Sequence, residues 1–305
     1  MTDWHLQGLD GGNPLAFLAA LGTLRSVSLA WPDQRMLIRW DPSGGAWRPR
    51  LETAGELPRD ALIPALHEQL RRMAGHPAFA FSKDLTLDAA QFREVALQAQ
   101  VRTEYGDNCF ADFVTAFASE VLVEGKGAKP AQIQDTALRT MSGAGHQHFV
   151  AFMTQLAEET TESHLTEALF LPWRYSDPGP SLRWDPTDDR RYALRWGEPS
   201  GDPVRTVRGA NRLAVEGLPL LPVMPVGRSL QTTGFSQRRG EVRWTWPIWE
   251  GSLDLDTVRS LLALRELQQS RPPREQLRAM GVVEIYRSMR ITQGKYRNFT
   301  PAMPV

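Results

Sequence analysis

The stretch NPLAFLAALGTLRSVSL, residues 13–29, decides how the rest of the chain folds. Asn13 is a favourable N-cap, because its side-chain oxygen accepts a hydrogen bond from a free amide of the first helical turn. Pro14 suits the first helical position, where its missing N–H group has no helical partner. Apolar residues then cover most of the helix circumference, and Arg25 is the only charge. A helix that is apolar nearly all round is buried, so the stretch predicts a central core helix on which later segments pack.

The composition is typical of a soluble globular protein, with 42% hydrophobic and 23% charged residues in a chain of 305. This length allows one large domain or two smaller ones. The apolar stretch is shorter than the roughly 20 residues that a membrane span needs, and it lacks the basic segment and cleavage site of a signal peptide. A single cysteine, Cys109, excludes an intrachain disulfide and is typical of a reducing compartment. We therefore expect a cytoplasmic protein with no membrane contact.

Helix caps, turns and hydrophobic periodicity predict a mixed α+β fold. Helix signals dominate the N-terminal half around the buried first helix, and β-hairpins are expected near residues 36–51 and 231–249. The C-terminal part is predicted to be basic, with a hairpin and helices. The predicted parts are a helix-rich core with an N-terminal hairpin at 1–172, a Trp- and Pro-rich connection at 173–203, and a basic subdomain at 204–305. One continuous domain is the alternative.

Three local patterns carry more specific predictions. Residues 108–123 carry phenylalanines at helical spacing and predict a single helix. Pro49 predicts that the second strand of the first hairpin lies at a sheet edge, because proline has no N–H group for a ladder. Residues 241–249 predict a strand, and Trp244 and Trp246 would share one of its faces.

The net charge is zero, but the charges are unevenly distributed along the chain. Residues 204–305 hold 16 Lys and Arg against 8 Asp and Glu, a net charge of +8, so residues 1–203 carry −8. A basic C-terminal third makes local phosphate binding a candidate function, with tyrosine rings available to stack on bases. The predicted nucleic-acid-binding residues are Arg205, Arg208, Arg212, Arg228, Arg238, Arg239, Arg287, Arg290, Lys295, Tyr296 and Arg297.

A glycine-rich loop before a predicted helix is a second candidate site. Glycines ahead of a helix N-terminus free backbone amides to point at an anion, and the helix dipole adds to the attraction. A plain glycine turn is an equally good interpretation. The residues of this predicted anion loop are Ser142, Gly143, Gly145, His146 and His148.

The sequence offers no positive case for an enzyme. It has no G-x-S-x-G elbow, P-loop lysine, HExxH or CxxC pattern. His146 and His148 lack a second pair of ligands at a spacing typical of zinc sites. We therefore expect no catalytic residue, no metal and no cofactor.

Several short tracts together resemble a known family. The tract GLDGGNPLAFLAALGTLR, residues 8–25, resembles the N-terminal signature of proteins encoded in type I-G (formerly I-U) CRISPR loci, in which a Pro-Leu pair leads into an apolar helix ending in Leu-Gly-x-Leu-Arg. Residues 142–149 resemble a glycine-rich tract further along the same proteins. Their C-terminal tracts are similar to residues 209–212, 233–235, 246–249 and 291–299. The opening signature is shared by large-subunit-like and accessory families.

The resemblance implies a non-catalytic subunit of an RNA-guided antiviral complex. Its expected partners are other subunits of the complex and guide RNA, target DNA or both. Two alternatives stay open at this point. The first alternative to a nucleic-acid-binding subunit is a protein-interaction scaffold without nucleic-acid contact. The second is a phosphate- or nucleotide-handling enzyme that uses the loop at residues 142–148.

Overall fold

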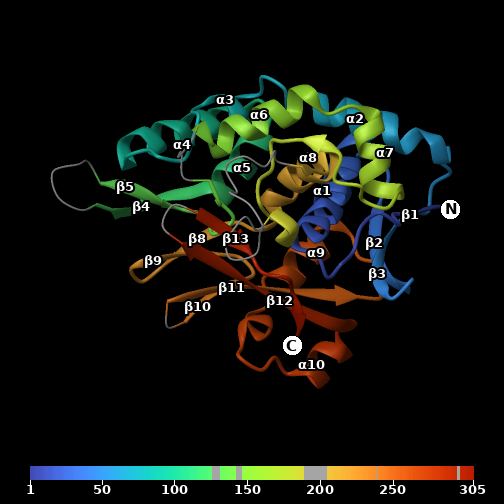
Figure 1. The fold of residues 1–305 in the computed structure, drawn as a ribbon. Coiled ribbons are helices and arrows are strands. Elements are labelled where there is room, and N and C mark those ends of the chain that lie inside the picture. Colours follow the sequence, from blue (N-terminus) through green and yellow to red (C-terminus); the bar gives the residue numbers. More distant parts are fainter. Residues whose placement is uncertain (126–130, 142–145, 189–204, 239, 294–295) are drawn as a thin grey trace.

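The structure is a computed structural model that describes residues 1–125, 131–141, 146–188, 205–238, 240–293 and 296–305. It confirms a mixed α+β protein, in which helices lie over small antiparallel sheets (Figure 1). The α-helices are α1 (Pro14–Ala30), α2 (Leu62–Arg71), α3 (Pro77–Ala80), α4 (Ala89–Glu104), α5 (Cys109–Phe117), α6 (Phe149–Glu159), α7 (Glu162–Phe170), α8 (Arg208–Gly217), α9 (Leu255–Leu262) and α10 (Arg274–Ala279).

The strands form one larger sheet, one three-stranded sheet and several two-stranded ribbons. They are β1 (Thr2–His5), β2 (Met36–Ser43), β3 (Ala46–Thr53), β4 (Ala118–Glu124), β5 (Gln132–Asp135), β6 (Asp177–Pro178), β7 (Arg205–Thr206), β8 (Val223–Val226), β9 (Ser229–Thr232), β10 (Phe235–Arg238), β11 (Glu241–Trp249), β12 (Val282–Gln293), β13 (Tyr296–Phe299) and β14 (Met303–Pro304). The 3₁₀ segments are η1 (Arg59–Ala61), η3 (Pro186–Asp188), η6 (Leu218–Leu220) and η7 (Arg265–Gln268).

The first helix is the buried centre of the molecule, as its sequence predicts. The side-chain oxygen of Asn13 accepts hydrogen bonds from the amides of Leu15 at 2.8 Å and Ala16 at 3.2 Å. Every residue from position 14 to 27 is buried. Its main partner is α8, and the two backbones approach so closely that a Cβ atom at Gly22 would lie 1.7 Å from the carbonyl oxygen of Leu213. The small residue is therefore needed for the contact between α1 and α8.

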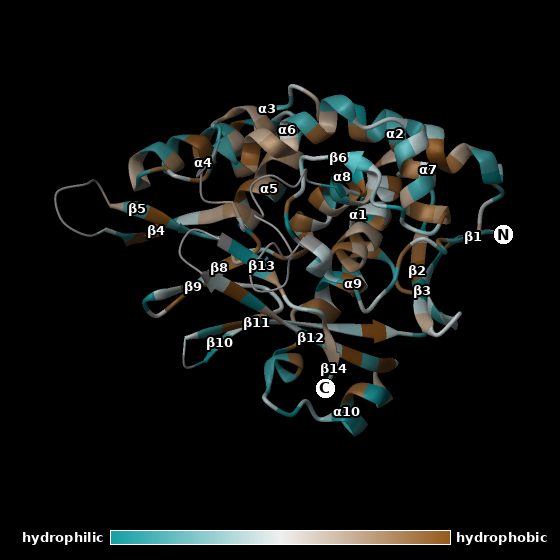
Figure 2. Cartoon of the chain, in the orientation of Figure 1, coloured by the Kyte–Doolittle hydropathy of each residue, from teal (hydrophilic) through white to brown (hydrophobic). Residues whose placement is uncertain are grey.

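The larger sheet has the strand order β10-β11-β12-β13, and β14 pairs with β12 beyond the end of β13. Trp244 and Trp246 share the inner face of β11, as predicted, and both are fully buried. Their rings pack on Phe17 of α1, with centroid distances of 6.1 Å and 5.6 Å. Hydrophobic colour marks the arrowhead end of β11, whereas β10 is mostly hydrophilic (Figure 2). The inner face of this sheet therefore changes character along its length.

The first hairpin forms as predicted, but the expectation that β3 lies at a sheet edge is wrong. The strand order is β1-β3-β2, which places β3 in the centre. Pro49 pairs with Trp40 on one side. On the other side β1 pairs only as far as His5 with Arg50, and the carbonyl of Pro49 then accepts a hydrogen bond from Leu6 at 3.0 Å. A central proline is tolerated here because no ladder bond requires its missing N–H group.

The prediction of one helix over residues 108–123 is also wrong. Helix α5 ends at Phe117, Ala118 is fully extended with φ −163° and ψ −177°, and the chain continues as β4. Strand β4 pairs with β5, with Val123 opposite Ile133. The phenylalanines are helically spaced only up to Phe117, and β-branched valines at alternate positions favour a strand after it. The resulting β4–β5 hairpin forms part of the candidate site.

Candidate nucleic-acid interface

A groove of about 1180 Å³ lies at one end of the larger sheet. One wall is the inner face of β10–β13, and the other is formed by the β4–β5 and β8–β9 hairpins, which lie above β10 and β11 at the left of Figure 1. Along β11, Trp244 and Trp246 face α1, whereas Val242, two residues nearer the start of the strand, lines the groove. We call this feature the arginine groove, because its lining contains Arg139, Arg228, Arg290 and Arg297.

Two predicted residues, Arg290 and Arg297, lie side by side in the arginine groove. The register of β12 and β13 pairs Arg290 with Phe299 and Thr292 with Arg297. Alternate residues of a strand share a face, so Arg290 and Arg297 project from the same face as diagonal neighbours. Within the described parts of the chain, neither guanidinium forms an ion pair with a carboxylate. Each instead donates one hydrogen bond to a backbone carbonyl, Arg290 to Ala137 at 2.8 Å and Arg297 to Arg139 at 3.2 Å.

The charge of Arg290 is poorly solvated. Its Nε atom is buried and has no hydrogen-bond partner. Burial and repulsion by Arg297 lower the pKa of Arg290 to about 10, against the attraction of Asp135, so the group stays charged at neutral pH. A half-buried charge without a carboxylate partner is unfavourable, and an anion that binds it relieves that cost.

Arg139 belongs to the same site but was missed in the sequence. Its Nε atom lies 3.0 Å from Oδ1 of Asp84, its Nη1 atom pairs with Asp135, and its Nη2 atom donates to Oγ1 of Thr86 at 2.9 Å. Burial disfavours its charge, but the carboxylates of Asp135 and Asp84 outweigh burial and raise the pKa of Arg139. The only signal for Arg139 in the sequence was an acidic residue, Asp135, four positions before it. Acid–base pairs at this spacing are common on protein surfaces.

The carboxylate of Asp135 is the internal counter-anion of the arginine groove. Burial raises the pKa of Asp135, while Arg139, Arg297 and Arg290 act in the opposite direction. Together with Glu124, Asp135 sets two acidic groups against the four arginines of the lining. The described lining therefore carries a net charge of +2 when both carboxylates are ionised.

The outer wall of the groove is a fixed structure. Arg228 lies in the turn between β8 and β9 and is exposed. The side-chain amide of Gln134 on β5 donates to the carbonyl of Arg228 at 3.3 Å and accepts from the amide of Leu230 at 2.7 Å. On the same side, Oγ1 of Thr232 accepts a hydrogen bond from the amide of Ala137 at 2.8 Å. These bonds join the two hairpins, so Arg228 is held at the rim.

The prediction is wrong for Arg208 and Arg212, which are buried structural residues. Arg212 is 0% exposed, and its Nη2 atom lies 2.8 Å from Oε1 of Glu216 and 3.0 Å from the carbonyl of Leu70. Arg208 pairs with Glu159 and also donates to backbone carbonyls. Both residues attach α8 to its neighbours and are closed to a ligand. Their spacing along the sequence did not reveal which side of α8 faces the core.

Arg287 lies on the opposite face of the sheet and is also wrongly assigned. It donates to Oγ1 of Thr245 at 2.9 Å and to the carbonyls of Gln269 at 2.7 Å and Ser270 at 3.1 Å. Burial, Arg243 and Arg238 lower the pKa of Arg287. Its donors satisfy the carbonyls that follow η7, which is a structural role.

Two further predicted residues, Arg205 and Arg238, lie outside the arginine groove. Arg205 is exposed and donates to the carbonyl of Ser176 at 2.7 Å. Arg238 is exposed at the end of β10, and the register places it on the face opposite to Gln237, which lines the groove. Arg239, Lys295, Ser142, Gly143 and Gly145 lie outside the described residues, and only the backbone of Tyr296 is described.

Two histidines of the predicted anion loop are described. His146 is exposed and has a positive φ of 60°. His148 precedes α6, and its Nδ1 atom lies 3.6 Å from Oδ2 of Asp84 without a hydrogen bond. Asp84 also binds Arg139, so the loop ends near the inner part of the arginine groove. An anion site in the loop itself stays a prediction.

Other chemistry has little support in the described residues. No group of three or more His, Cys, Asp or Glu within them is arranged to hold a metal ion. Burial raises the pKa of Cys109 to about 11 despite the nearby Arg25, so this thiol is not an activated nucleophile. None of the described helices combines the length and the apolar character needed to cross a bilayer.

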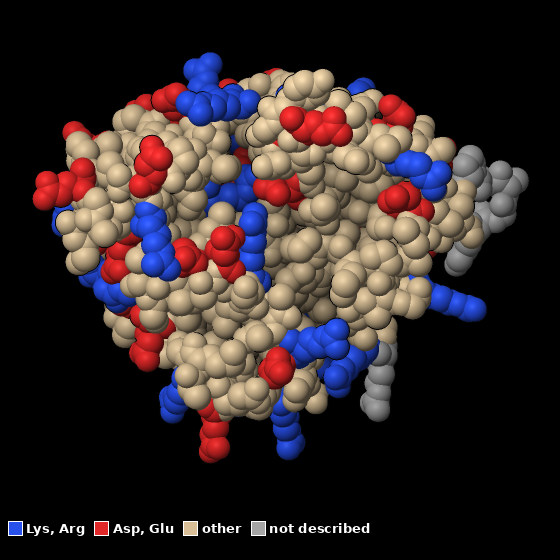
Figure 3. Space-filling view, turned by 180° about the vertical axis from the view of Figure 1, so that it is seen from behind, with Lys and Arg blue, Asp and Glu red and all other residues tan. Residues whose placement is uncertain are grey.

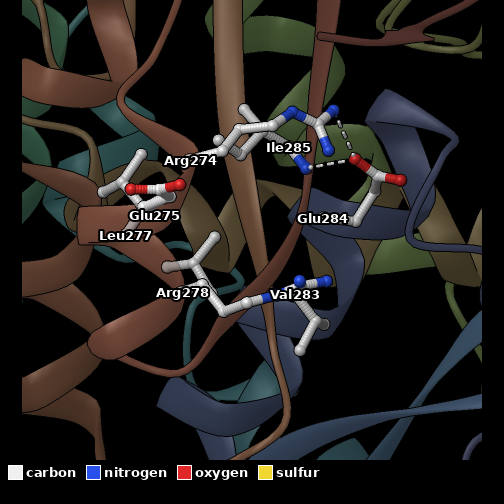
Figure 4. Close-up of a pocket in the computed structure, with 8 residues that line it drawn as sticks. Arg274, Glu275, Leu277, Arg278, Val283, Glu284 and Ile285 are labelled. Carbon is white, nitrogen blue, oxygen red and sulfur yellow. Dashed lines mark hydrogen bonds and ion pairs between the residues drawn. The ribbon is translucent and has the colours of Figure 1, made fainter.

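Two further surfaces were compared with the arginine groove. A pocket of about 120 Å³ beside α10 contains Arg274 and Glu284, whose side chains pair with each other at 3.1 Å (Figure 4). Arg274 also donates to the carbonyl of Val305 at 2.8 Å, so its charge is already partnered. On the face seen in Figure 3, acidic and basic side chains are interspersed among the residues drawn in colour. The pocket beside α10 has about a tenth of the volume of the groove.

A scan against models of protein families found no match, and a search among curated proteins found no similar sequence. The resemblance to type I-G CRISPR proteins therefore stays a prediction.

Proposed function

We propose that this chain is a non-catalytic nucleic-acid-binding subunit of a CRISPR-type antiviral complex, and that the arginine groove holds the phosphate backbone. The observation that carries the proposal is the pair Arg290 and Arg297, adjacent on one sheet face and without a carboxylate partner in the described chain. The N-terminal signature at residues 8–25 supports the choice of complex. The expected partners are guide RNA or target DNA and other subunits.

The chemistry of the pair suits phosphate. A guanidinium group has five N–H donors, and each of these two arginines uses only one of them in a hydrogen bond to a described carbonyl. The remaining donors can form a bidentate pair with a phosphate group. Because burial already weakens the hydration of Arg290, little solvation is lost when an anion replaces water.

The direct test is the loss of binding in Arg290→Gln with Arg297→Gln. Affinity of the full chain, alone and with the products of neighbouring genes, is measured for RNA, single-stranded DNA and duplex DNA by fluorescence anisotropy over a range of salt. We expect at least a tenfold loss of affinity. Two fewer phosphate contacts should also reduce the slope of log affinity against log salt by about 1.4 to 1.8.

Arg72→Gln is the matched control, because Arg72 is an exposed arginine directly after α2 whose side chain pairs with Glu68 and Gln69 of that helix and does not line the arginine groove. It should leave both affinity and salt slope unchanged. The proposal fails if no nucleic acid binds at moderate salt, or if the double variant binds as well as Arg72→Gln does.

A protein-interaction scaffold is the second candidate, because one helix face is apolar and exposed. Leu97, Val101 and Tyr105 occur at intervals of four on α4 and are 50%, 52% and 85% exposed. Such a stripe is typical of a helix that contacts a partner. If this function holds, Val101→Asp abolishes co-purification with the other subunits and leaves nucleic-acid affinity unchanged; retention of the subunits by the variant would exclude it.

A further inference from the structure

The cations of the arginine groove lie below its walls. The Nε atom of Arg290 is inaccessible to solvent, and Arg297 is only partly exposed. Gln134 ties the β4–β5 hairpin to the β8–β9 hairpin, which closes the side opposite the sheet. A ligand phosphate must therefore pass between two walls to reach both arginines.

This geometry is unfavourable for a duplex. A double helix carries its phosphates on the outside of a wide rod, and proteins meet it with a convex element in a groove or with a broad cationic face. A β-ribbon can enter the major groove, but the described strands β4 and β5 contain the acidic residues Glu120, Glu124 and Asp135. The connection between them, which includes Lys126 and Lys129, lies outside the described residues. The volume of about 1180 Å³ slightly exceeds the upper range of small-molecule sites, which is room for a few nucleotides.

The groove also offers groups that suit unpaired bases. Gln132, Gln231 and Gln237 line it, and their side-chain amides bond no other described residue. A glutamine amide has both donors and acceptors, which match the hydrogen-bonding edges of a base. Those edges are fully accessible only when the strand is unpaired. Phe235 is almost entirely buried against Trp244, so stacking on aromatic rings contributes less here.

We infer that the arginine groove takes a short unpaired stretch of nucleic acid, with successive phosphates on Arg290 and Arg297 and base edges toward Gln132, Gln231 and Gln237. This inference rests on the proposed function and narrows its ligand. Salt-dependent phosphate contacts then supply affinity, and the neutral amides supply contacts that salt does not screen.

The test compares strands of one sequence and length in unpaired and duplex form. Binding of the full chain to single-stranded RNA, single-stranded DNA and the corresponding duplex is measured at fixed salt. We expect at least one of the single strands to bind tenfold or more tightly than the duplex. Arg290→Gln with Arg297→Gln should remove this preference together with the affinity.

A second variant distinguishes the contribution of the glutamines to binding from that of the arginines. Gln132→Ala with Gln231→Ala removes exposed amides and no charge, so it should fold normally. It should weaken single-strand binding several-fold at an unchanged salt slope and leave the weak duplex binding as it is. The control is Gln69→Ala with Gln98→Ala, which removes two glutamine amides from exposed positions outside the groove.

The outcomes distinguish this inference from the proposed function. Duplex binding that equals or exceeds single-strand binding, and that depends on Arg290 and Arg297, would overturn the inference and leave the proposed function intact. Equal loss of duplex and single-strand binding in the glutamine variant would also overturn it. Absence of binding to every nucleic acid would overturn both.

Discussion

One sheet face has two halves with different surroundings. At one half, Trp244 and Trp246 pack on α1; at the other, Arg290 and Arg297 line an open groove. The register pairs Val242 with Arg290 and Trp244 with Ser288, so the halves are continuous on the same strands. The change from buried tryptophans to arginines occurs within one residue pair of β11 and β12. The difference between core and candidate site therefore follows from what covers the sheet.

Two indole groups of the covered half bond to backbone carbonyls. The indole N–H of Trp246 donates to the carbonyl of Gly11 at 2.8 Å, and that of Trp249 donates to the carbonyl of Ile38 at 3.0 Å. The open half leaves the buried Nε atom of Arg290 without a partner. The indole nitrogen of Trp244 in the covered half is also buried without a partner, so the two halves differ in the charge that they carry and not in how completely their hydrogen bonds are satisfied.

The largest expected effect is on the covered half. Trp246→Ala should lower the free energy of unfolding by about 3–5 kcal/mol, because it removes a fully buried aromatic ring. Urea denaturation measures the change. Met289→Ala, on the outer face of the neighbouring strand β12, should change stability by less than about 0.5 kcal/mol. Similar losses in the two variants would contradict the assignment of the inner face as core.

The contact that covers this half is the next target. Gly22→Ala places a methyl group against the carbonyl of Leu213 and should force α1 and α8 apart, at a loss of more than about 2 kcal/mol. Gly251→Ala is the matched control, because nothing lies within 4 Å of its added Cβ atom and its φ is not positive. Thermal melting of both variants checks this, and equal melting temperatures would be inconsistent with the close approach of the helices.

The open half should respond in the opposite manner. Arg290→Met removes a poorly solvated charge, so the free energy of unfolding should stay the same or rise by up to about 1 kcal/mol. Nucleic-acid affinity should fall about tenfold in the same variant. Paired denaturation and binding measurements test this combination. A substantial loss of stability would instead show that Arg290 stabilises the fold through its hydrogen bond to the carbonyl of Ala137.

The smallest expected effect concerns Asp135 and pH. Burial raises the pKa of Asp135, so this carboxylate gains its proton at a higher pH than an exposed aspartate does. Protonation removes a negative charge beside Arg139, Arg290 and Arg297, so nucleic-acid affinity should rise a few-fold as the pH falls through this raised pKa. Asp135→Asn should bind more tightly at pH 7 and lose most of this pH dependence. An unchanged pH profile in the variant would exclude Asp135 as the internal counter-anion.

Local signals in the sequence predicted the scaffold well. The Asn13 cap, Pro14 and an apolar circumference predicted α1 because these interactions form within one turn or follow from complete burial. Alternation along residues 241–249 predicted the inner face of β11 for the same local reason. The break between α5 and β4 was missed, because the phenylalanine spacing continues to Phe117 and the pairing of β4 with β5 is a tertiary event.

The candidate site could be predicted only in part. Arg228, Arg290 and Arg297 were among the expected residues, but Arg208, Arg212 and Arg287 were chosen on equal grounds and are structural. Arg139 was missed because it follows a short strand with no basic neighbours. A run of arginines in the sequence indicates how much positive charge is present. It does not indicate which guanidinium groups are already paired in the folded protein.

By itself, the sequence determined the elements whose signals are local: the buried helix, the first hairpin at β2 and β3, and the alternating faces of β11. The tertiary structure alone decided which cations are free, because that depends on which acids and carbonyls lie opposite each arginine once strands and helices distant in the chain meet. Periodicity follows from the backbone geometry of one segment, whereas the partnering of a charge depends on contacts between segments that no local pattern encodes.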